Sequence, residues 1–578
     1  MRKTKIVCTL GPATDREGVL REMLLAGMNV ARFNFSHGSH EEHKQRLDQL
    51  KALREELDLP VAAMLDTKGP EIRLRSFRNG SVMLKTGQDF TLTTEDVPGD
   101  ETRCAVTYAE LPQDVKAGNT ILLDDGLVRL TVLETTASTV HCRVENDGIM
   151  KNNKGVNIPG VRLSLPYMSQ RDREDILFGA EQGFDFVAAS FVRTAADVRE
   201  IRSLLDSVNS KIRIIAKIEN QDGVNNLSEI LSVADGIMVA RGDMGVEIPL
   251  EEVPVLQKLL IKKCYAAGKP AITATQMLDS MMKSPRPTRA ETTDVANAIY
   301  DGTSAIMLSG ETAAGMYPLE AVETMARIAM RAEASIDYEG RFRKRAYATS
   351  TNVTSAISHA TVTSAHDLHA SAIITVTKSG TTARVISKYR PNCAIIGCTT
   401  SEIVWRQLSL SWGVVPLMIQ EESNTDDLFE HAVDSAVNAG LIKDGELVVL
   451  TAGVPLGISG TTNLMKVHVV GHMLVTGTGL CGGQVTAPLC VAKDEDQALD
   501  TFRSGNILVI HQVTKSLLPL LRKAAGLILE DSDPDGTGAI AGLSLDIPVI
   551  IGASGATRIL KSGAVVTMDG LKGTVSCN

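Results

Sequence analysis

Short apolar runs recur between residues 5 and 308, and most of them end in polar or charged residues. The eight runs cover residues 5–9, 28–35, 61–65, 184–191, 213–218, 236–239, 270–274 and 304–308. Continuous Val, Ile, Ala and Leu are typical of parallel strands that are buried on both faces. We therefore predict eight parallel strands, with the polar residues at their carboxyl ends.

The segments between these runs have the spacing of helices. The predicted helices cover residues 15–26, 40–57, 170–182, 195–208, 222–233, 250–267, 289–300 and 318–334. Several begin at acidic, Ser or Thr residues and end at Gly, as helices commonly do. Strands alternating with helices predict an α/β fold built on a closed (β/α)8 barrel, in which the carboxyl ends of the strands face the active site.

The alternation of strands and helices breaks once, after Pro70. Residues 81–85, 89–93, 120–123, 128–134 and 139–144 show a period of two, with Gly and Asp turns between them. This pattern predicts a small β-barrel lid domain inserted over residues 70–165, with Pro70 and Pro166 as its hinges.

Two more domains are predicted beyond the barrel, which would comprise residues 1–69 and 166–340. Apolar runs at residues 372–377, 394–398, 414–418, 447–450 and 466–470 predict an α/β domain over residues 347–472. Residues 476–578 are rich in Gly and Val and predict a separate C-terminal domain.

The composition narrows the classes of function. The chain has 578 residues, 44% of them hydrophobic, with a mean hydropathy of +0.04, which suits three or four globular domains. An aromatic content of 4% and a net charge of −10 argue against binding to nucleic acid or anionic lipid. Nine scattered cysteines and no apolar run of bilayer length predict a cytoplasmic protein without disulfides or membrane contact.

Charged residues follow the fifth and sixth predicted strands. Lys217 and Glu219 end one strand, and Asp243 follows the next. Alternation places Lys217 and Glu219 on one side of their strand, and neighbouring strand ends bring Glu219 and Asp243 within reach of one ion. Two carboxylates without His or Cys suit Mg²⁺ or Mn²⁺. The alternative is a structural ion pair between Lys217 and Glu219.

A second polar group follows the first three strands. Arg32, Asn34 and Ser36 are spaced by two and share one face, and Asp66 and Thr67 end the third strand. The oxygen atoms of this group suit a second, weaker cation site, and the guanidinium of Arg32 suits phosphate. Taken singly, each residue is better explained as a polar residue of the rim.

Hydroxyl and carboxyl groups follow the last two strands, at Thr275, Ser309 and Glu311. Such groups bind a substrate carboxylate or relay a proton. The sequence has no GxSxG elbow and no Cys at a strand end beside a basic residue, so no nucleophile is evident. Cations arranged around anions, including Arg32 and Arg73, favour phosphoryl transfer.

Long motifs resemble pyruvate kinase. They are KIVCTLGPAT, MNVARFNFSHG, LDTKGPEIR, KGVNIPG, AKIEN, MVARGDMGVEIP, ATQML, PTRAETTDVANAIYDGTSAIMLSGETAAGMYP and TKSGTTARVISKYRP. The resemblance covers residue 3 to about residue 472. The resemblance implies a barrel, an inserted lid and a C-terminal α/β domain, usually in a homotetramer. It also implies transfer of the phosphoryl group of phosphoenolpyruvate to ADP, giving ATP and pyruvate.

The same resemblance implies a role for each residue that matches a motif. The implied catalytic residues are Lys217, which stabilises the phosphoryl group in flight, Arg32 and Thr275, with Ser309 and Glu311 behind Thr275 for proton transfer. The implied substrate-binding residues are Arg32, Lys217, Gly242, Asp243 and Thr275. The implied nucleotide-binding residues are Asn34, His37, Arg73 and Lys154. The implied Mg²⁺ (or Mn²⁺) ligands are Glu219 and Asp243. The implied K⁺ ligands are Asn34, Ser36, Asp66 and Thr67.

Two acidic residues refine the resemblance. An acid at Glu71 resembles the K⁺-dependent members of the family, whereas a Lys there can stand in for the ion, so we expect K⁺ dependence. Glu42 departs from members that carry an aromatic residue near the nucleotide, which leaves the contacts to the base open.

A hydroxyl-rich turn precedes a predicted helix in the α/β domain. Its residues are Thr377, Lys378, Ser379, Gly380, Thr381 and Thr382. A helix start of this kind suits an anion. In the family this loop receives the phosphate of an allosteric sugar phosphate, so the resemblance implies a phosphorylated small-molecule effector. A plain helix cap is the alternative.

The C-terminal residues resemble the mobile phosphohistidine domain of phosphoenolpyruvate-utilising enzymes, in GLSLDIPVIIGASGATRIL and VTMDGLKGTV. Residues 535–539 replace the segment that carries the phosphorylated His there, and they contain no His. We therefore expect a structural or regulatory appendage. A different phosphoenolpyruvate or pyruvate barrel enzyme is disfavoured by Arg73 and Lys154, and a silent metabolite-sensing scaffold is disfavoured by the intact Lys217, Glu219 and Asp243.

Overall fold

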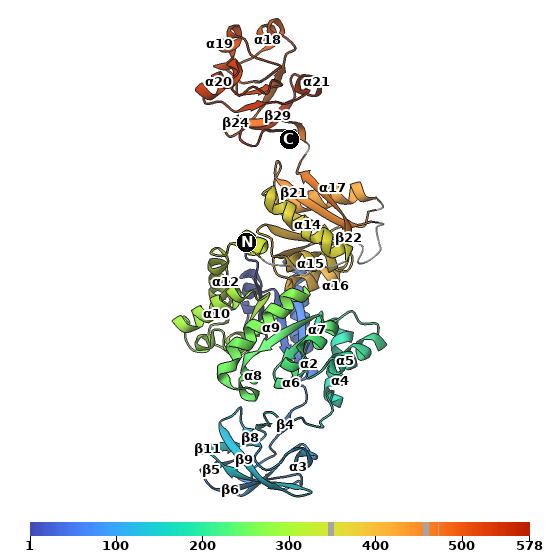
Figure 1. The fold of residues 1–578 in the computed structure, drawn as a ribbon, viewed down its shortest axis with the longest axis vertical. Coiled ribbons are helices and arrows are strands. Elements are labelled where there is room, and N and C mark those ends of the chain that lie inside the picture. The colour runs from blue at the N-terminus through green and yellow to red at the C-terminus, as the bar shows by residue number, and fades with distance from the viewer. Residues whose placement is uncertain (345–351, 423, 455–461, 472, 578) are drawn as a thin grey trace. The chain divides into compact units, whose positions relative to one another are not determined.

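The computed structural model describes residues 1–344, 352–422, 424–454, 462–471 and 473–577 (Figure 1). These residues form two compact units. The first holds residues 1–359 and 377–418, and the second holds residues 360–376, 419–456 and 462–578, in each case as far as they are described.

A closed barrel of eight parallel strands lies at the centre of the first unit, as the apolar runs predict. The strands follow the order β1-β17-β16-β15-β14-β13-β3-β2 around the barrel. Their bounds are β1 (Lys5–Thr9), β2 (Val30–Asn34), β3 (Ala62–Asp66), β13 (Phe186–Ala189), β14 (Arg213–Ile218), β15 (Gly236–Ala240), β16 (Ala271–Ala274) and β17 (Ala305–Leu308).

Helices surround the barrel strands (Figure 1). They are α1 (Val19–Leu25), α2 (His40–Glu56), α4 (Gln170–Gln182), α5 (Ala195–Ser207), α6 (Gln221–Asn225), α7 (Leu227–Val233), α8 (Arg241–Glu247), η1 (Leu250–Glu252), α9 (Val253–Ala267), η2 (Asp279–Met282), α10 (Arg289–Asp301), α11 (Gly310–Ala313), α12 (Pro318–Glu333) and α13 (Tyr338–Lys344). The helix predicted over 222–233 is wrong as one element, because Asn226 leaves the helical conformation between α6 and α7 (φ −94°, ψ 12°).

Alternation along the strands decides which side chains reach the barrel interior. On β14, Ile215 belongs to the inner apolar cluster, whereas Ile214, Ala216 and Ile218 pack outward against the helices. A period of two therefore directs Lys217 inward. The same parity holds on β3, where Ala62 and Met64 are inner residues, and it directs Asp66 inward above them.

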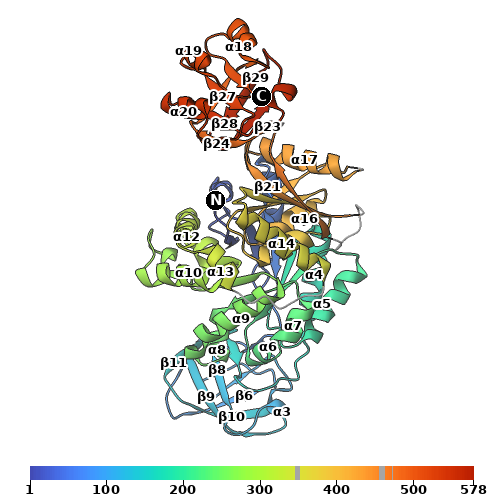
Figure 2. The same ribbon diagram turned by 45° about the horizontal axis from the view of Figure 1, so that its top comes forward.

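The lid is inserted between β3 and α4 (Figure 2). Its seven-stranded sheet has the order β4-β12-β8-β9-β10-β6-β7, and β11 pairs with β5. The bounds are β4 (Ile72–Arg73), β5 (Ser81–Leu84), β6 (Asp89–Thr93), β7 (Arg103–Ala105), α3 (Leu111–Asp114), β8 (Thr120–Leu123), β9 (Val128–Thr135), β10 (Thr139–Val144), β11 (Gly148–Lys151) and β12 (Gly155–Asn157). The sequence pattern missed β4, β7, β11 and β12, which have two to four residues each.

The later residues of the first unit include α15 (Thr381–Lys388), α16 (Glu402–Gln407), η3 (Leu408–Leu410) and the parallel pair β19 (Ala394–Thr399) and β20 (Val414–Met418). Leu410 joins the inner apolar cluster of the barrel, and the Lys5 ammonium donates to the carbonyl of Val414 at 2.6 Å. The segment 408–414 therefore packs against the barrel itself.

The second unit contains two sheets. β18 (Ala372–Val376) pairs in parallel with β21 (Leu447–Gly453), which pairs antiparallel with β22 (Thr462–Val469), and α14 (Val353–Asp367) and α17 (Thr425–Asn438) lie between strands in the chain. An eight-stranded sheet of order β23-β30-β29-β25-β26-β27-β28-β24 follows. Its elements are β23 (Met473–Thr476), β24 (Thr478–Cys481), β25 (Gln484–Val491), α18 (Glu495–Thr501), β26 (Ile507–Ile510), η4 (Lys515–Leu517), α19 (Leu518–Leu521), β27 (Gly526–Leu529), α20 (Thr537–Ser544), β28 (Val549–Ile551), α21 (Ala556–Ile559), β29 (Val565–Asp569) and β30 (Thr574–Cys577).

Within the described residues, none of the helices has the length and hydropathy that crossing a lipid bilayer requires.

Candidate active site

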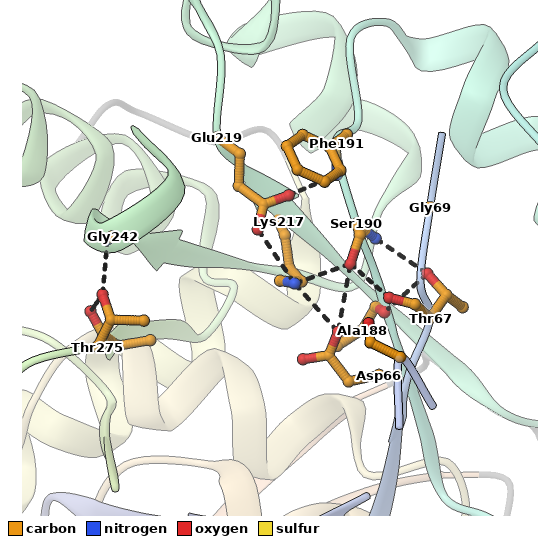
Figure 3. Close-up of polar contacts among 12 residues, drawn as sticks. Asp66, Thr67, Gly69, Ala188, Ser190, Phe191, Lys217, Glu219, Gly242 and Thr275 are labelled. Atoms are coloured by element: carbon orange, nitrogen blue, oxygen red, sulfur yellow. Dashed lines mark hydrogen bonds and ion pairs between the residues drawn. The ribbon is translucent and has the colours of Figure 1, made fainter. Parts of the chain in front are cut away.

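Lys217 lies at the centre of a buried polar cluster at the carboxyl end of the barrel (Figure 3). Its ammonium donates to Ser190 Oγ at 2.7 Å and to Asp66 Oδ1 at 3.0 Å, and it lies 3.0 Å from Glu219 Oε1. The contact with Glu219 confirms that both residues project to the same side of their strand.

Arg32, on β2, completes the cluster beside Asp66 of the neighbouring strand β3. Its Nε donates to Asp66 Oδ2 at 2.5 Å, and its Nη1 donates to Thr9 Oγ1 at 3.0 Å. Asp66 therefore holds two cations, one on each carboxylate oxygen, and it is 1% exposed.

The charges of this cluster support one another. Burial alone would raise the pKa of Asp66, but the charges of Arg32 and Lys217 outweigh it and hold that pKa below its ordinary value. Burial likewise opposes the charge of Lys217, yet Asp66 and Glu219 raise its pKa above the ordinary value, so the ammonium stays protonated. The barrel mouth thus keeps a buried positive charge in place.

Glu219 stands at the edge of the cluster. Burial raises its pKa to about 8, and the nearby charge of Asp243 adds to the effect, while Lys217 opposes it. Glu219 Oε2 accepts a hydrogen bond from the backbone N–H of Phe191 at 2.5 Å. A cation beside Glu219 and Asp243 would relieve the repulsion between these two carboxylates.

Thr275 faces the first residues of α8. The N–H of Gly242 donates to Thr275 Oγ1 at 2.7 Å, and Arg241 Nη2 donates to the carbonyl of Thr275 at 2.7 Å. Thr275 and Gln276 have φ angles of 69° and 53°, a left-handed conformation that costs free energy in residues other than Gly and is common at active sites. Arg241, Gly242 and Asp243 follow β15 directly, as the sequence predicts, and they form the first turn of α8.

Ser309 and Glu311 differ in the hydrogen bonds that their side chains make. The two carboxylate oxygens of Glu311 accept from the backbone N–H groups of Leu278 (3.0 Å) and Ser309 (2.7 Å). Ser309 Oγ is buried and makes no hydrogen bond within the described residues. Glu311 therefore orders the loops, and Ser309 is the better placed of the two to meet a ligand.

The predicted K⁺ ligands end β2 and β3. Asn34 and Asp66 are opposite one another in the parallel register. Asn34 Oδ1 accepts from the N–H of Ser36 at 3.2 Å, and Thr67 Oγ1 accepts from the N–H of Ser190 at 3.1 Å. The oxygen atoms of these residues are the hard ligands that K⁺ requires.

A cavity of about 450 Å³ lies between the lid and the barrel. Arg73 and Lys154 line it from the lid, and Asp243 lines it from α8. Both lid cations are already paired within the lid: Arg73 Nε with Glu71 Oε2 at 2.8 Å, and Lys154 Nζ with Asp124 Oδ1 at 2.8 Å. The predicted nucleotide residues Asn34 and His37 are not among the described residues that line this cavity.

The carboxylates of the cavity fit a divalent cation. Burial and the charge of Asp243 raise the pKa of Asp125 and of Glu247, so several acids repel one another there. Within the described residues, no three His, Cys, Asp or Glu side chains converge as a complete metal site. Asp243 lines the cavity, and Glu219 is not among the described residues that do. These two carboxylates suit Mg²⁺ or Mn²⁺, because Mg²⁺ is commonly held by one or two carboxylates and completed by substrate oxygens and water.

Sequence reasoning missed Ser190. Its hydroxyl accepts from Lys217 and donates to the carbonyl of Thr67 at 2.6 Å, so it joins the lysine to the third strand. Its place directly after β13 was the available signal, since the polar residue that ends a barrel strand faces the active site. Asn157 and Glu247, which line the cavity under the lid, gave no such signal.

The hydroxyl-rich turn lies where the sequence predicts it. Thr377 and Lys378 follow β18, and Thr381 and Thr382 begin α15. Gly380 precedes the helix with φ 76°, no side chain caps the helix start, and Ser379 Oγ lies 2.9 Å from Thr381 Oγ1. The phosphate site and the plain helix cap both stay predictions for this turn.

The fold and the cluster around Lys217 define a (β/α)8-barrel enzyme whose mouth holds fixed cations for an anionic substrate. Residues 1–322 match the family of pyruvate kinase barrel domains, residues 355–468 match the pyruvate kinase alpha/beta domain, and residues 502–573 match the mobile domain of PEP-utilising enzymes. The chain belongs to the pyruvate kinase family and is a phosphotransferase with an additional C-terminal domain.

Known relatives agree over the whole length. The pyruvate kinase of Sporosarcina psychrophila is 50% identical over 578 residues, which cover 100% of this chain and 99% of the relative. The pyruvate kinase of Geobacillus stearothermophilus is 50% identical over 577 residues, which cover 99% and 98%. A crystal structure of a pyruvate kinase from Cryptosporidium parvum superposes with a TM-score of 0.77 at 41% identity, covering 81% of this chain and 96% of that one. The predicted fold class and family are confirmed.

Proposed function

We propose that the chain transfers the phosphoryl group of phosphoenolpyruvate to ADP, giving ATP and pyruvate. The observation that carries the proposal is the charged, buried ammonium of Lys217, held by Asp66, Ser190 and Glu219 at the barrel mouth. Two polyanionic substrates repel each other strongly in a cleft of low dielectric constant unless fixed cations offset their charge.

The residues of the mouth would divide the work. Lys217 stabilises the phosphoryl group during transfer, and Arg32 binds the substrate with a guanidinium oriented by Asp66. The N–H groups of Gly242 and Asp243 and the hydroxyl of Thr275 hold the substrate carboxylate. Protonation of the enolate comes from the Thr275 side, where Ser309 Oγ has no hydrogen-bond partner among the described residues.

Two ions belong to the proposal. Glu219 and Asp243 would hold Mg²⁺ or Mn²⁺, which when bound offsets the negative charge of the phosphate groups. The proposed K⁺ ligands are Asn34, Ser36, Asp66 and Thr67. Glu71 is acidic and is paired with Arg73 and Lys68, so it leaves no free cation at that position to replace K⁺.

The nucleotide is proposed to bind in the cavity under the lid. Arg73 and Lys154 line it and are suited to phosphate oxygens. Asn34 and His37 would contribute from the end of β2, and His37 is exposed there.

A coupled assay for pyruvate tests the reaction. Phosphoenolpyruvate and ADP should give pyruvate only with a divalent cation, and the rate should fall strongly when K⁺ is replaced by a nonbinding counterion. Full activity without K⁺ would contradict the K⁺ site but not the reaction. Absence of pyruvate with and without the divalent cation, and in each case with and without K⁺, would contradict the reaction itself.

Regulation and assembly are proposed on further features. A phosphorylated small molecule would bind the turn Thr377–Thr382 at the start of α15. A homotetramer is proposed from the family alone. Leu250, Val255 and Leu259, which are 73%, 62% and 40% exposed on η1 and α9, offer apolar surface for contact between copies. Light scattering and titration with a sugar phosphate test these two points.

The domain boundaries and the role of the tail are also proposals. The barrel would comprise residues 1–69 and 166–340, the lid 70–165, the α/β domain 347–472 and the tail 476–578, of which residues 345–351, 423, 455–461, 472 and 578 lie outside the described residues. The tail has no His at residues 535–539, so it would act as a regulatory or structural appendage in a cytoplasmic enzyme. Phosphate found on Thr537 during turnover would reverse this assignment.

A further inference from the structure

A single side-chain hydrogen bond links the sheet of the lid to a barrel helix across the cavity. Asn157 Nδ2, at the end of β12, donates to Glu247 Oε1, at the end of α8, at 2.7 Å. Among the described residues, the other polar side-chain contacts between residues 70–165 and the barrel lie at the hinges: Arg193 to the carbonyl of Leu165, and Lys68 with Glu71. Among the described residues, the bond between Asn157 and Glu247 is therefore the one such contact that joins the sheet of the lid to a helix of the barrel.

On the lid side, Asn157 is rigidly connected to the cations that line the cavity. β12 pairs with β4, where Gly155 is opposite Arg73, and also with β8. Arg73 Nη1 donates to the carbonyl of Asn153, and the carbonyl of Lys154 accepts from the N–H of Leu74. Arg73, Lys154 and Asn157 therefore move together when the lid moves.

On the barrel side, Glu247 is rigidly connected to the residues proposed to hold the substrate. α8 is anchored at its start, because Arg241 donates to the carbonyls of Ala274 and Thr275. Glu247 follows Asp243 by four residues, so the two side chains share one face of the helix, and both line the cavity.

Like charges oppose closure of the lid. Asp125 lines the cavity from the lid, and Asp243 lines it from α8. Burial raises the pKa of Asp125, and the charge of Asp243 raises it further, which shows that the two carboxylates repel each other. A favourable contact must offset this repulsion in the closed lid before any cation binds.

We propose that the hydrogen bond from Asn157 to Glu247 is the latch that holds the lid closed over the cavity and sets the distance of Arg73 and Lys154 from α8. Asn157 and Glu247 are positioning residues, since they act through the cations of the lid and the helix rather than on the reacting atoms. The catalytic consequence rests on the proposed function, but the closed lid itself does not.

The test uses the full-length enzyme and begins with three variants, to which Asn157→Ser is added below. Asn157→Asp places a carboxylate against Glu247 and removes the donor. The double variant Asn157→Asp with Glu247→Gln restores one donor and one acceptor with their positions exchanged. Asn119→Asp is the matched control, because it adds the same charge to the lid while keeping the acceptor that Asn119 offers to the N–H of Lys116.

The first readout is hydroxyl-radical footprinting of the ligand-free enzyme. Phe191 lines the cavity, and Phe90 is fully buried in the core of the lid. Asn157→Asp should raise oxidation of Phe191 severalfold and leave Phe90 protected, which shows an open but folded lid. Oxidation of Phe90 as well would mean that Asn157→Asp unfolds the lid. Asn157→Ser, which shortens the side chain without adding charge, then replaces it and should raise oxidation of Phe191 while Phe90 stays protected.

The second readout is steady-state kinetics. Asn157→Asp should raise KM for ADP about tenfold, because hydrogen bonds to charged groups are commonly worth one factor of ten or more, and KM for phosphoenolpyruvate should change much less. The double variant should recover most of both losses, and Asn119→Asp should behave as the wild type. Unchanged Phe191 oxidation and ADP kinetics in Asn157→Asp, or no recovery in the double variant, would overturn the latch. A wild-type enzyme that forms no pyruvate would refute the proposed reaction but leave the footprinting result intact.

Discussion

The barrel mouth and the cavity under the lid contain the same kinds of charged residues, but the charges are balanced at the mouth and partly unbalanced in the cavity. At the mouth, Lys217 and Arg32 share the buried carboxylate of Asp66, so cations and anions are balanced before any ligand arrives. In the cavity, the lid cations Arg73 and Lys154 are held by acids of the lid. Asp243 on α8 repels Asp125 of the lid across the cavity.

This difference separates a preorganised region from one that a ligand completes. Buried charges need partners, and a cluster that already has them costs no reorganisation when a substrate binds. Acids that repel one another are stabilised when a cation enters. We therefore expect changes at the mouth to lower the rate of phosphoryl transfer, and changes in the cavity to alter nucleotide affinity.

Replacement of Lys217 should have the largest effect. Lys217→Met removes the ammonium of the mouth, and kcat should fall about 10²–10³-fold, the usual loss for one group that stabilises a transition state. KM for ADP should change little, because Lys217 is not among the residues lining the cavity. The pyruvate assay measures both, with Lys151→Met, an exposed lysine of the lid, as control. A kcat near that of the control would remove Lys217 from the proposed role.

Replacement of Lys154 should affect binding rather than rate. Lys154→Ala removes a cation from the cavity, and KM for ADP should rise about tenfold, with a smaller change in kcat. The same assay at saturating phosphoenolpyruvate measures this, and the exposed Lys116→Ala is the control. A fall in kcat as large as that of Lys217→Met would show that the two regions are not distinct.

The sequence predicts the mouth better than the cavity, and the reason is periodicity. Alternation along single strands places Lys217 beside Glu219, and it directs Asp66 to the barrel interior. The contact between Asn157 and Glu247 joins residues 90 positions apart in the chain, and no local pattern connects them. It depends on how the lid lies on the barrel, which is a property of tertiary packing.

Two further misses have local causes. Ser190 is a small residue after an apolar strand, and its role depends on the hydrogen bonds that it makes to Lys217 and Thr67 rather than on its type. The sequence places Arg241–Asp243 after the sixth strand but does not reveal that Arg241 bonds to the loop after β16 and starts the helix α8. Propensity alone does not reveal such an anchor.

Replacement of Ser190 should have a moderate effect and would sharpen the account of the mouth. Ser190→Ala removes one acceptor of Lys217 and the hydroxyl bound to the carbonyl of Thr67, a proposed K⁺ ligand. We expect kcat to fall about fivefold and the K⁺ concentration for half-maximal activity to rise. A K⁺ titration of initial rates measures both, and Ser232→Ala, on the exposed side of α7, is the control. Loss of kcat with unchanged K⁺ dependence would confine Ser190 to orienting Lys217.

Replacement of Asp125 should have the smallest effect, and its sign is the informative part. Asp125→Asn removes one of the two charges that repel each other across the cavity, so the closed lid should be favoured and KM for ADP should fall about twofold. Oxidation of Phe191 in the ligand-free enzyme should fall with it. Because the Asn side chain has nearly the same size as that of Asp, a change in packing cannot explain a decrease in KM. An increase in KM would mean instead that Asp125 itself contributes to binding the nucleotide or its cation, and the cavity would then be as fully prepared for its ligand as the mouth is.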